Sequence, residues 1–252
     1  MQNITHFIIA LLVAATISSC ADQVNLNNMN HASPIISETP TLQTVLDQRK
    51  NQWANKADAA TKTDYAAGIQ AVVESGIVNT AKNVGDTAPN FTLTNATGAE
   101  VQLKDYLQRG PVVLTWYRGG WCPYCNLTLH RLQAELPNFK AAGANLLALT
   151  PELPDKSIST KEKNELEFEV LSDVGNTVAR EYGIVFELTP EVAERYQAGF
   201  DLHGFNGDES NELPLAATYV IDMDGTIRYA FLDAEYRNRA EPAAILKALK
   251  TL

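Results

Sequence analysis

Two cysteines separated by two residues offer the most specific chemistry in this sequence. Cys122-Pro-Tyr-Cys125 follows an apolar run at residues 111–117 and opens a segment with helical spacing. Backbone N–H groups in the first turn of a helix lack intrahelical partners, so they stabilise a thiolate placed there. Cysteine pKa values in such positions fall to roughly 3.5–7.5. The spacing therefore predicts a pair that serves reactivity or metal binding.

The helical spacing also predicts a role for each cysteine. Residues i and i+3 share a helix face, so Cys122 and Cys125 can close a disulfide without a large backbone movement. Pro123 suits the first helical position, where a missing N–H costs nothing. We expect Cys122, at the cap, to be the exposed attacking thiol and Cys125 to be the resolving thiol.

Three neighbouring side chains are further candidates for this site. Arg118 precedes Cys122 by four residues; it either stabilises the thiolate electrostatically or is a solvated loop cation. Trp121 and Tyr124 flank the pair. They either form an apolar lip around the sulfurs or simply pack beside the end of the strand.

Elements of alternating type would position these residues. Apolar runs and helical spacings alternate from residue 111 to residue 182, and a hairpin and a closing helix follow them. Such alternation predicts a mostly parallel sheet covered on both faces, and the final hairpin makes the sheet mixed. A Cys-x-x-Cys motif in this context indicates a thioredoxin-like α/β fold. We assign it to residues 85–252, with a helical extension over residues 41–84 packed on it.

The first forty residues have a different character. Residues 1–19 lack charged side chains, and their apolar run at 7–17 has the length of a signal-peptide core but is too short to span a bilayer. The run ends in Ile17-Ser-Ser-Cys20, which resembles a bacterial lipobox. We expect a signal peptide over 1–19, lipidation of Cys20 as the first mature residue, and a disordered tether over 20–40. The alternative is an ordinary export signal with an incidental cysteine.

Composition limits the partners and the location. The 252 residues carry a formal net charge of -10, which argues against binding nucleic acid. An anionic lipid surface would repel such a chain unless the Cys20 lipid anchored it. With Cys20 lipidated, only two thiols remain, which is too few for a disulfide scaffold. We therefore expect an exported protein of the cell envelope or periplasm, anchored to the membrane through Cys20.

Four segments together resemble the AhpC/TSA family of peroxiredoxins. They are the turn and strand GDTAPNFTL at 85–93, Ser-Asp followed by Ala-x-x-Tyr-Gly-Ile at 172–184, the hairpin strands from 217, and the loop WYRGGWCPYCNL at 116–127. The resemblance covers roughly residues 41–250. It implies a thioredoxin fold, reduction of hydroperoxides through a dithiol/disulfide cycle, a thioredoxin-like reductant and no cofactor.

The active-site pattern departs from that family. In the family's Pro-x-x-x-Thr-x-x-Cys, the Pro position falls on Arg118, the Thr position on Cys122 and the attacking Cys on Cys125. The family's arginine before a late strand falls near Ala216. Cys-Pro-Tyr-Cys is instead the glutaredoxin form, although Ala216 and Ala217 stand where glutaredoxins carry a cis-proline.

Three functions remain open on this reasoning. The first is a peroxidase, in which a thiolate becomes a sulfenic acid and then a disulfide. The second is an exported oxidoreductase that exchanges disulfides with proteins or small molecules. The third is a module in which Cys122, Cys125 and either His130 or His203 bind copper or zinc.

Overall fold

The computed structural model describes residues 40–252, which form one compact unit. The expected signal peptide, Cys20 and nearly all of the tether lie outside the described residues. Among the described helices, none has the length and apolar character needed to cross a bilayer.

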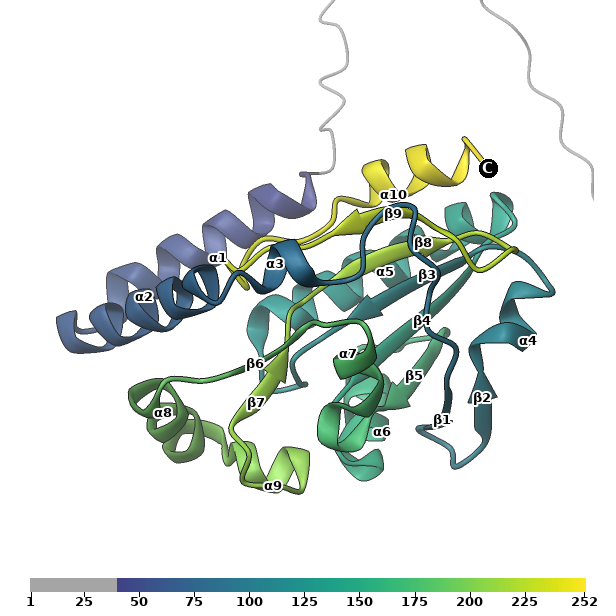
Figure 1. Cartoon of the computed structure of the whole chain (residues 1–252). Coiled ribbons are helices and arrows are strands. Elements are labelled where there is room, and N and C mark those ends of the chain that lie inside the picture. The colour runs from purple at the N-terminus through teal and green to yellow at the C-terminus, as the bar shows by residue number, and fades with distance from the viewer. Residues whose placement is uncertain (1–39) are drawn as a thin grey trace, which may run out of the picture. The chain divides into compact units, whose positions relative to one another are not determined.

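A seven-stranded mixed sheet forms the centre of the fold (Figure 1). Its strands in spatial order are β2 (Glu100–Gln102), β1 (Thr92–Asn95), β5 (Glu169–Ser172), β4 (Asn145–Thr150), β3 (Val112–Trp116), β8 (Thr218–Ile221) and β9 (Ile227–Phe231). Strands β3, β4 and β5 pair in parallel, whereas β8 pairs antiparallel to β3 and β9 pairs antiparallel to β8. The prediction of a thioredoxin-like mixed sheet is confirmed.

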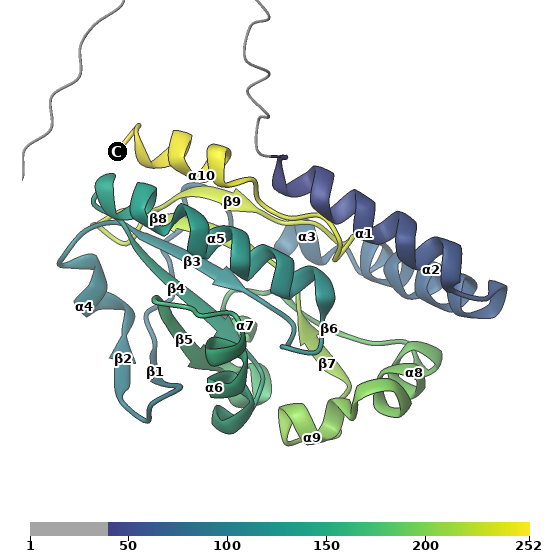
Figure 2. The same cartoon turned by 180° about the vertical axis from the view of Figure 1, so that it is seen from behind.

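Both faces of the central strands are buried, as continuous apolar runs such as residues 112–116 predict. Val113 and Tyr117 pack in the core on one face, whereas Val112, Leu114 and Trp116 pack on the other. Helices α1 (Leu42–Lys56), α5 (Pro123–Ala141) and α10 (Pro242–Leu249) contribute to the first core, and Figure 2 shows all three on the same side of the sheet. Short helices contribute to the second core: α3 (Ile77–Thr80), α4 (Leu103–Leu107) and α7 (Thr177–Glu181).

The N-terminal extension is helical, as its spacing predicts. Helix α1 is followed by α2 (Ala59–Glu74) and α3, and Leu42 and Leu46 are buried in the core. The Glu241 carboxylate, just before α10, accepts hydrogen bonds from the backbone N–H groups of Leu42 (3.2 Å) and Gln43 (2.6 Å). These N–H groups have no intrahelical partners, so the C-terminal segment caps the start of α1.

A segment between α7 and β8 forms one side of the site. It contains a two-stranded sheet of β6 (Val185–Glu187) and β7 (Glu212–Pro214), with α8 (Pro190–Phe200) and α9 (Leu202–Asn206) between them. The spacing of residues 189–199 predicts a helix, which corresponds to α8, whereas neither the small sheet nor α9 is predicted. Helix α8 packs on α2, where Arg195 donates a hydrogen bond of 2.7 Å to Asp64. The remaining helix, α6 (Pro154–Lys163), packs beside β5.

Candidate active site

The cysteine pair lies where the sequence places it, at the junction of β3 and α5. Cys122 is the N-cap residue in an extended conformation, and Pro123 opens the helix. The loop before it depends on two glycines. A Cβ atom at Gly119 would overlap the Trp121 indole, and one at Gly120 would overlap the Thr160 hydroxyl. Gly119 therefore leaves room for the Trp121 side chain, and Gly120 lets the loop lie close against α6.

Both sulfurs are buried. Cys122 is 1% exposed and Cys125 is 0% exposed, so the expectation of an exposed Cys122 is wrong. The physical reason is tertiary: side chains of α1, α8 and the segment before α10 surround the start of α5. Spacing along α5 cannot predict a cover built from segments so far away in the sequence.

The surroundings favour negative charge on Cys125 rather than on Cys122. The Arg118 backbone N–H donates to Cys125 Sγ at 3.4 Å, and Arg239 Nη2 donates to it at 3.5 Å. Burial raises the pKa of Cys125, but the hydrogen bond from the Cys122 thiol and the Arg239 and Arg118 charges outweigh it and lower that pKa well below its usual range. Burial, together with the proton shared with Cys125, raises the pKa of Cys122.

Sequence reasoning missed Arg239. The residue precedes α10 and reaches the site across the fold, with its side chain almost fully buried. The family's arginine position falls near Ala216, beside β8, where no cation is available. A guanidinium therefore reaches Cys125 Sγ from a different segment of the chain. No sequence motif around Arg239 indicates this role.

Arg118 is fully buried, so the interpretation as a solvated loop cation is wrong. Its Nη2 donates to the Tyr196 hydroxyl at 2.6 Å. Its guanidinium carbon lies 4.1 Å from the ring centroid of Tyr236, 5.2 Å from that of Tyr196 and 5.3 Å from that of Trp121. The Arg118 charge opposes the rise that burial causes in the pKa of each thiol.

Trp121 and Tyr124 lie beside the sulfurs within an aromatic wall. Trp121 stacks on Phe200 with ring centroids 4.1 Å apart, and Tyr124 meets Tyr236 edge-on at 5.8 Å. With Cys122 they line a pocket of about 160 Å³ that also includes Trp53, Tyr65, Arg118, Pro123 and Tyr196. We call it the aromatic pocket. The pocket is lined by Cys122 and not by Cys125.

A buried carboxyl group, Glu152, was also missed from the sequence. It follows β4, is 0% exposed and accepts the Gly120 backbone N–H at 2.7 Å. The Thr160 hydroxyl donates to it at 3.5 Å. Burial raises the pKa of Glu152 to about 7, despite the hydrogen bond from Gly120. Glu152 therefore fixes the active-site loop and titrates near neutral pH.

The metal-binding hypothesis finds no support in residues 40–252, where no group of three potential ligands occurs. His130 lines a separate surface hollow with Arg49 and Asn164, and His203 Nε2 lies 2.9 Å from Asn211 Oδ1.

Comparison with known proteins identifies the family. The model of the AhpC/TSA family matches residues 84–230, which is more than half of the chain. The chain belongs to the AhpC/TSA family. Chloroplastic peroxiredoxin Q of Oryza sativa subsp. japonica is 30% identical over 172 residues, covering 67% of each chain.

Other similar proteins carry the names of two different activities. The thiol-disulfide oxidoreductase ResA of Bacillus cereus is 29% identical over 103 residues, covering 40% of this chain and 58% of ResA. Among solved structures, peroxidoxin BcpB of Mycobacterium tuberculosis superposes with a TM-score of 0.54 at 21% identity, covering 68% of this chain and 97% of BcpB. The shared fold is that of peroxiredoxins, and the protein is a thiol oxidoreductase.

Proposed function

We propose that this protein reduces hydroperoxides, with Cys125 as the attacking thiolate and Cys122 as the resolving thiol. The observation that carries the proposal is the environment of Cys125 Sγ, which accepts hydrogen bonds from the Arg118 backbone and the Arg239 guanidinium. A peroxidatic cysteine needs such donors because its thiolate is the nucleophile. The assignment reverses the roles expected from helix position alone.

The reaction then has two internal steps. The Cys125 thiolate attacks the terminal oxygen of the hydroperoxide, the O–O bond breaks, and the alkoxide leaves and takes up a proton as the alcohol. Cys125 is now a sulfenic acid. The Cys122 sulfur attacks it, water leaves, and a Cys122–Cys125 disulfide forms.

A thioredoxin-like dithiol supplies the two electrons that reset the cycle through a mixed disulfide. Arg239 has a second use in the first step. Its cation lies where negative charge moves from sulfur toward the leaving oxygen, and a fixed cation stabilises that charge in a dry site. This arrangement replaces the arginine that the family places near Ala216.

Rapid mixing of the reduced protein with hydrogen peroxide or cumene hydroperoxide tests the proposal. Trp121 adjoins the dithiol, so tryptophan fluorescence reports oxidation. We expect a fast phase proportional to peroxide that Cys122→Ser retains and Cys125→Ser loses. Cys122→Ser should accumulate a sulfenic acid that dimedone traps. A wild-type rate no higher than that of a free thiol would exclude the peroxidase.

A second function, disulfide exchange through Cys122, is favoured by a different observation. The aromatic pocket reaches Cys122 rather than Cys125, so a bulky disulfide meets Cys122 first. The similarity to ResA is compatible with this activity. Cys125→Ser should then trap a mixed disulfide through Cys122, and Cys122→Ser should trap none.

We also propose that the protein is exported and anchored through lipid on Cys20. The apolar run at 7–17 and the Ser-Ser-Cys sequence after it support this. Metabolic labelling with a fatty acid in a bacterial host tests it, with Cys20→Ala as the control. Equal labelling of both forms, or no labelling of either, would contradict the lipid anchor.

A further inference from the structure

Arg118 carries a buried charge, and not all of its hydrogen-bond donors are paired. Its side chain is 1% exposed, and both Nε and Nη1 lack a hydrogen-bond partner. No carboxylate of residues 40–252 forms an ion pair with it. A buried guanidinium with unpaired donors destabilises the folded state, because these donors have lost their hydrogen bonds to water without gaining an equivalent acceptor.

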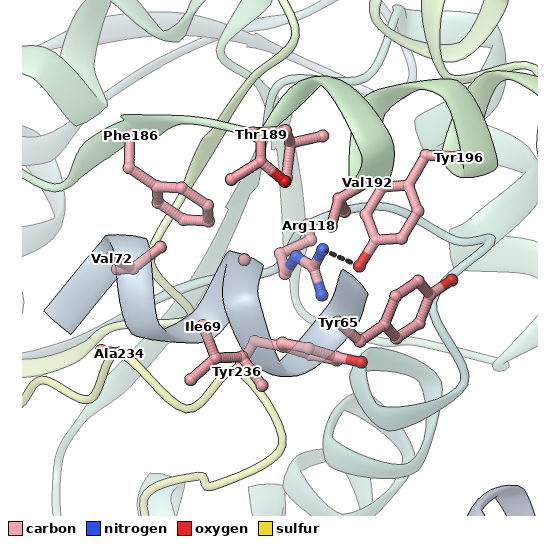
Figure 3. A pocket seen from close by; sticks show the side chains of 12 residues that line it. Tyr65, Ile69, Val72, Arg118, Phe186, Thr189, Val192, Tyr196, Ala234 and Tyr236 are labelled. Atoms are coloured by element: carbon pink, nitrogen blue, oxygen red, sulfur yellow. Dashed lines mark hydrogen bonds between the residues drawn. The ribbon is translucent and has the colours of Figure 1, made fainter. Parts of the chain in front are cut away.

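The Arg118 guanidinium does not donate these unpaired N–H groups to either cysteine sulfur. Arg118 contacts Cys125 Sγ through its backbone N–H, whereas the side-chain hydrogen bond to that sulfur comes from Arg239. The Arg118 side chain instead extends between Tyr196, Tyr236 and Tyr65, as Figure 3 shows. Aromatic faces attract a cation but accept no conventional N–H hydrogen bond from its edge.

The guanidinium lines two adjacent hollows. One is the aromatic pocket, which includes Cys122. The other, drawn in Figure 3, is an apolar hollow lined by Ile69, Val72, Phe186 and Val192, and the Thr189 hydroxyl in it also lacks a partner. Helices α2 and α8 supply most of these residues. A cation with unpaired donors therefore lies among apolar side chains, at the pocket that Cys122 lines.

We propose that Arg118 is the specificity residue for a substrate that carries a carboxylate on a compact apolar or aromatic body. The carboxylate accepts hydrogen bonds from the guanidinium, the body packs against the aromatic rings, and the hydroperoxide group faces the thiols. The planar fork of arginine matches a carboxylate with two N–H donors. The inference rests on the proposed peroxidase function and names the class of its substrate.

The charge of the whole molecule opposes the approach of an anion. The net charge of -10 repels anions at long range. A preference for an anionic substrate over its neutral ester must therefore arise from a local cation, and Arg118 is a cation of the aromatic pocket itself.

A matched pair of substrates tests the proposal. A short hydroperoxide bearing a carboxylate and its methyl ester have the same reacting group and differ only in charge. We expect kcat/KM for the acid to exceed that for the ester about tenfold to a hundredfold, the range of a hydrogen bond to a charged group. Arg118→Gln should remove this preference, measured as the ratio of the two rates so that any change in thiol reactivity cancels.

No turnover of either substrate would mean that the peroxidase proposal has failed. Turnover of both at equal rates would overturn this inference alone.

A binding measurement needs no turnover. Quenching of tryptophan fluorescence, to which Trp121 contributes, should report binding of 3-phenylpropionate to the reduced wild type, and its amide should bind at least tenfold more weakly. The matched control is Arg237→Gln, because Arg237 also lies near Tyr236 but already has Glu235 as its partner. The acid preference should survive in Arg237→Gln and vanish in Arg118→Gln. Should Arg118→Gln fail to fold, loss of the preference in Arg237→Gln, or equal wild-type affinity for acid and amide, would overturn the proposal.

Discussion

The guanidinium of Arg239 donates a hydrogen bond to Sγ of Cys125 at 3.5 Å, from a segment 114 residues further along the chain. This contact brings a cation to the sulfur that stands at the family's peroxide-attacking position, although the family's own arginine position holds no arginine here. The charge on this sulfur therefore depends on how the loop before α10 packs against α5.

Replacing Arg239 with glutamine should raise the pKa of Cys125 by removing the cation that stabilises its thiolate. Loss of a hydrogen bond to a charged group costs about 1.5–3 kcal/mol, which shifts the thiolate–thiol equilibrium of Cys125 roughly tenfold to a hundredfold toward the thiol. Iodoacetamide alkylation and thiolate absorbance across a pH series measure this, and activity should recover as pH rises. Arg228→Gln is the control, since Arg228 lies on β9 and pairs with Asp222 and Asp224. An unchanged alkylation profile in Arg239→Gln would contradict the assignment.

Glu152 should make stability fall as pH rises toward neutrality. Its pKa is raised from about 4.5 to about 7 in the folded state. Protonated Glu152 therefore contributes fully to the free energy of unfolding below about pH 4.5, and this contribution is lost as pH rises through about 7. A shift of this size corresponds to about 3 kcal/mol. Urea unfolding measures this. As pH rises from 4 to 8, the free energy of unfolding of Glu152→Gln should increase relative to that of the wild type by up to that amount. Glu167→Gln, whose side chain is 70% exposed, should track the wild type. Parallel curves for Glu152→Gln would refute the titration of Glu152 in this range.

Gly120 should not tolerate a side chain while Thr160 keeps its hydroxyl. Gly120→Ala places a Cβ atom against Thr160 Oγ1, and such overpacking costs about 1–3 kcal/mol. Combining it with Thr160→Ala should recover part of the loss in a double-mutant cycle measured by denaturant unfolding. Gly199→Ala in α8 is the control, because nothing lies within 4 Å of its added Cβ. Strict additivity of the two substitutions would argue against the contact.

Glu241 should hold the start of α1 against the C-terminal segment. Glu241→Ala removes the acceptor of two backbone N–H groups, those of Leu42 and Gln43, and loss of such a cap costs about 1 kcal/mol. Hydrogen exchange at the first turn of α1 should accelerate, and exchange in β3 and β4 should not. Glu181→Ala, an exposed residue on α7, should leave α1 unchanged. Unaltered exchange at Leu42 and Gln43 would show that the carboxylate does not cap the helix.

The features that the sequence predicts are those set by interactions between residues close together in the chain. Residues 111–125 predict a buried strand, a loop and a helix with a cysteine at its cap, and the structure has all of these. Local spacing carries that information because a strand, a glycine loop and an i, i+3 pair depend on neighbouring residues. The helical extension and the mixed sheet follow from the same periodicities.

Tertiary packing decided how the site works. Cys122 is buried because α1, α8 and the segment before α10 surround it, and no pattern near residue 122 encodes that cover. Arg239 and Glu152 reach the active-site loop from 114 and 32 residues away, so their roles depend on the completed sheet. The sequence alone thus determined that two thiols meet at the start of a helix. Only the fold decided which of them carries the charge, because charge in a buried site is set by the donors and cations that packing brings to it.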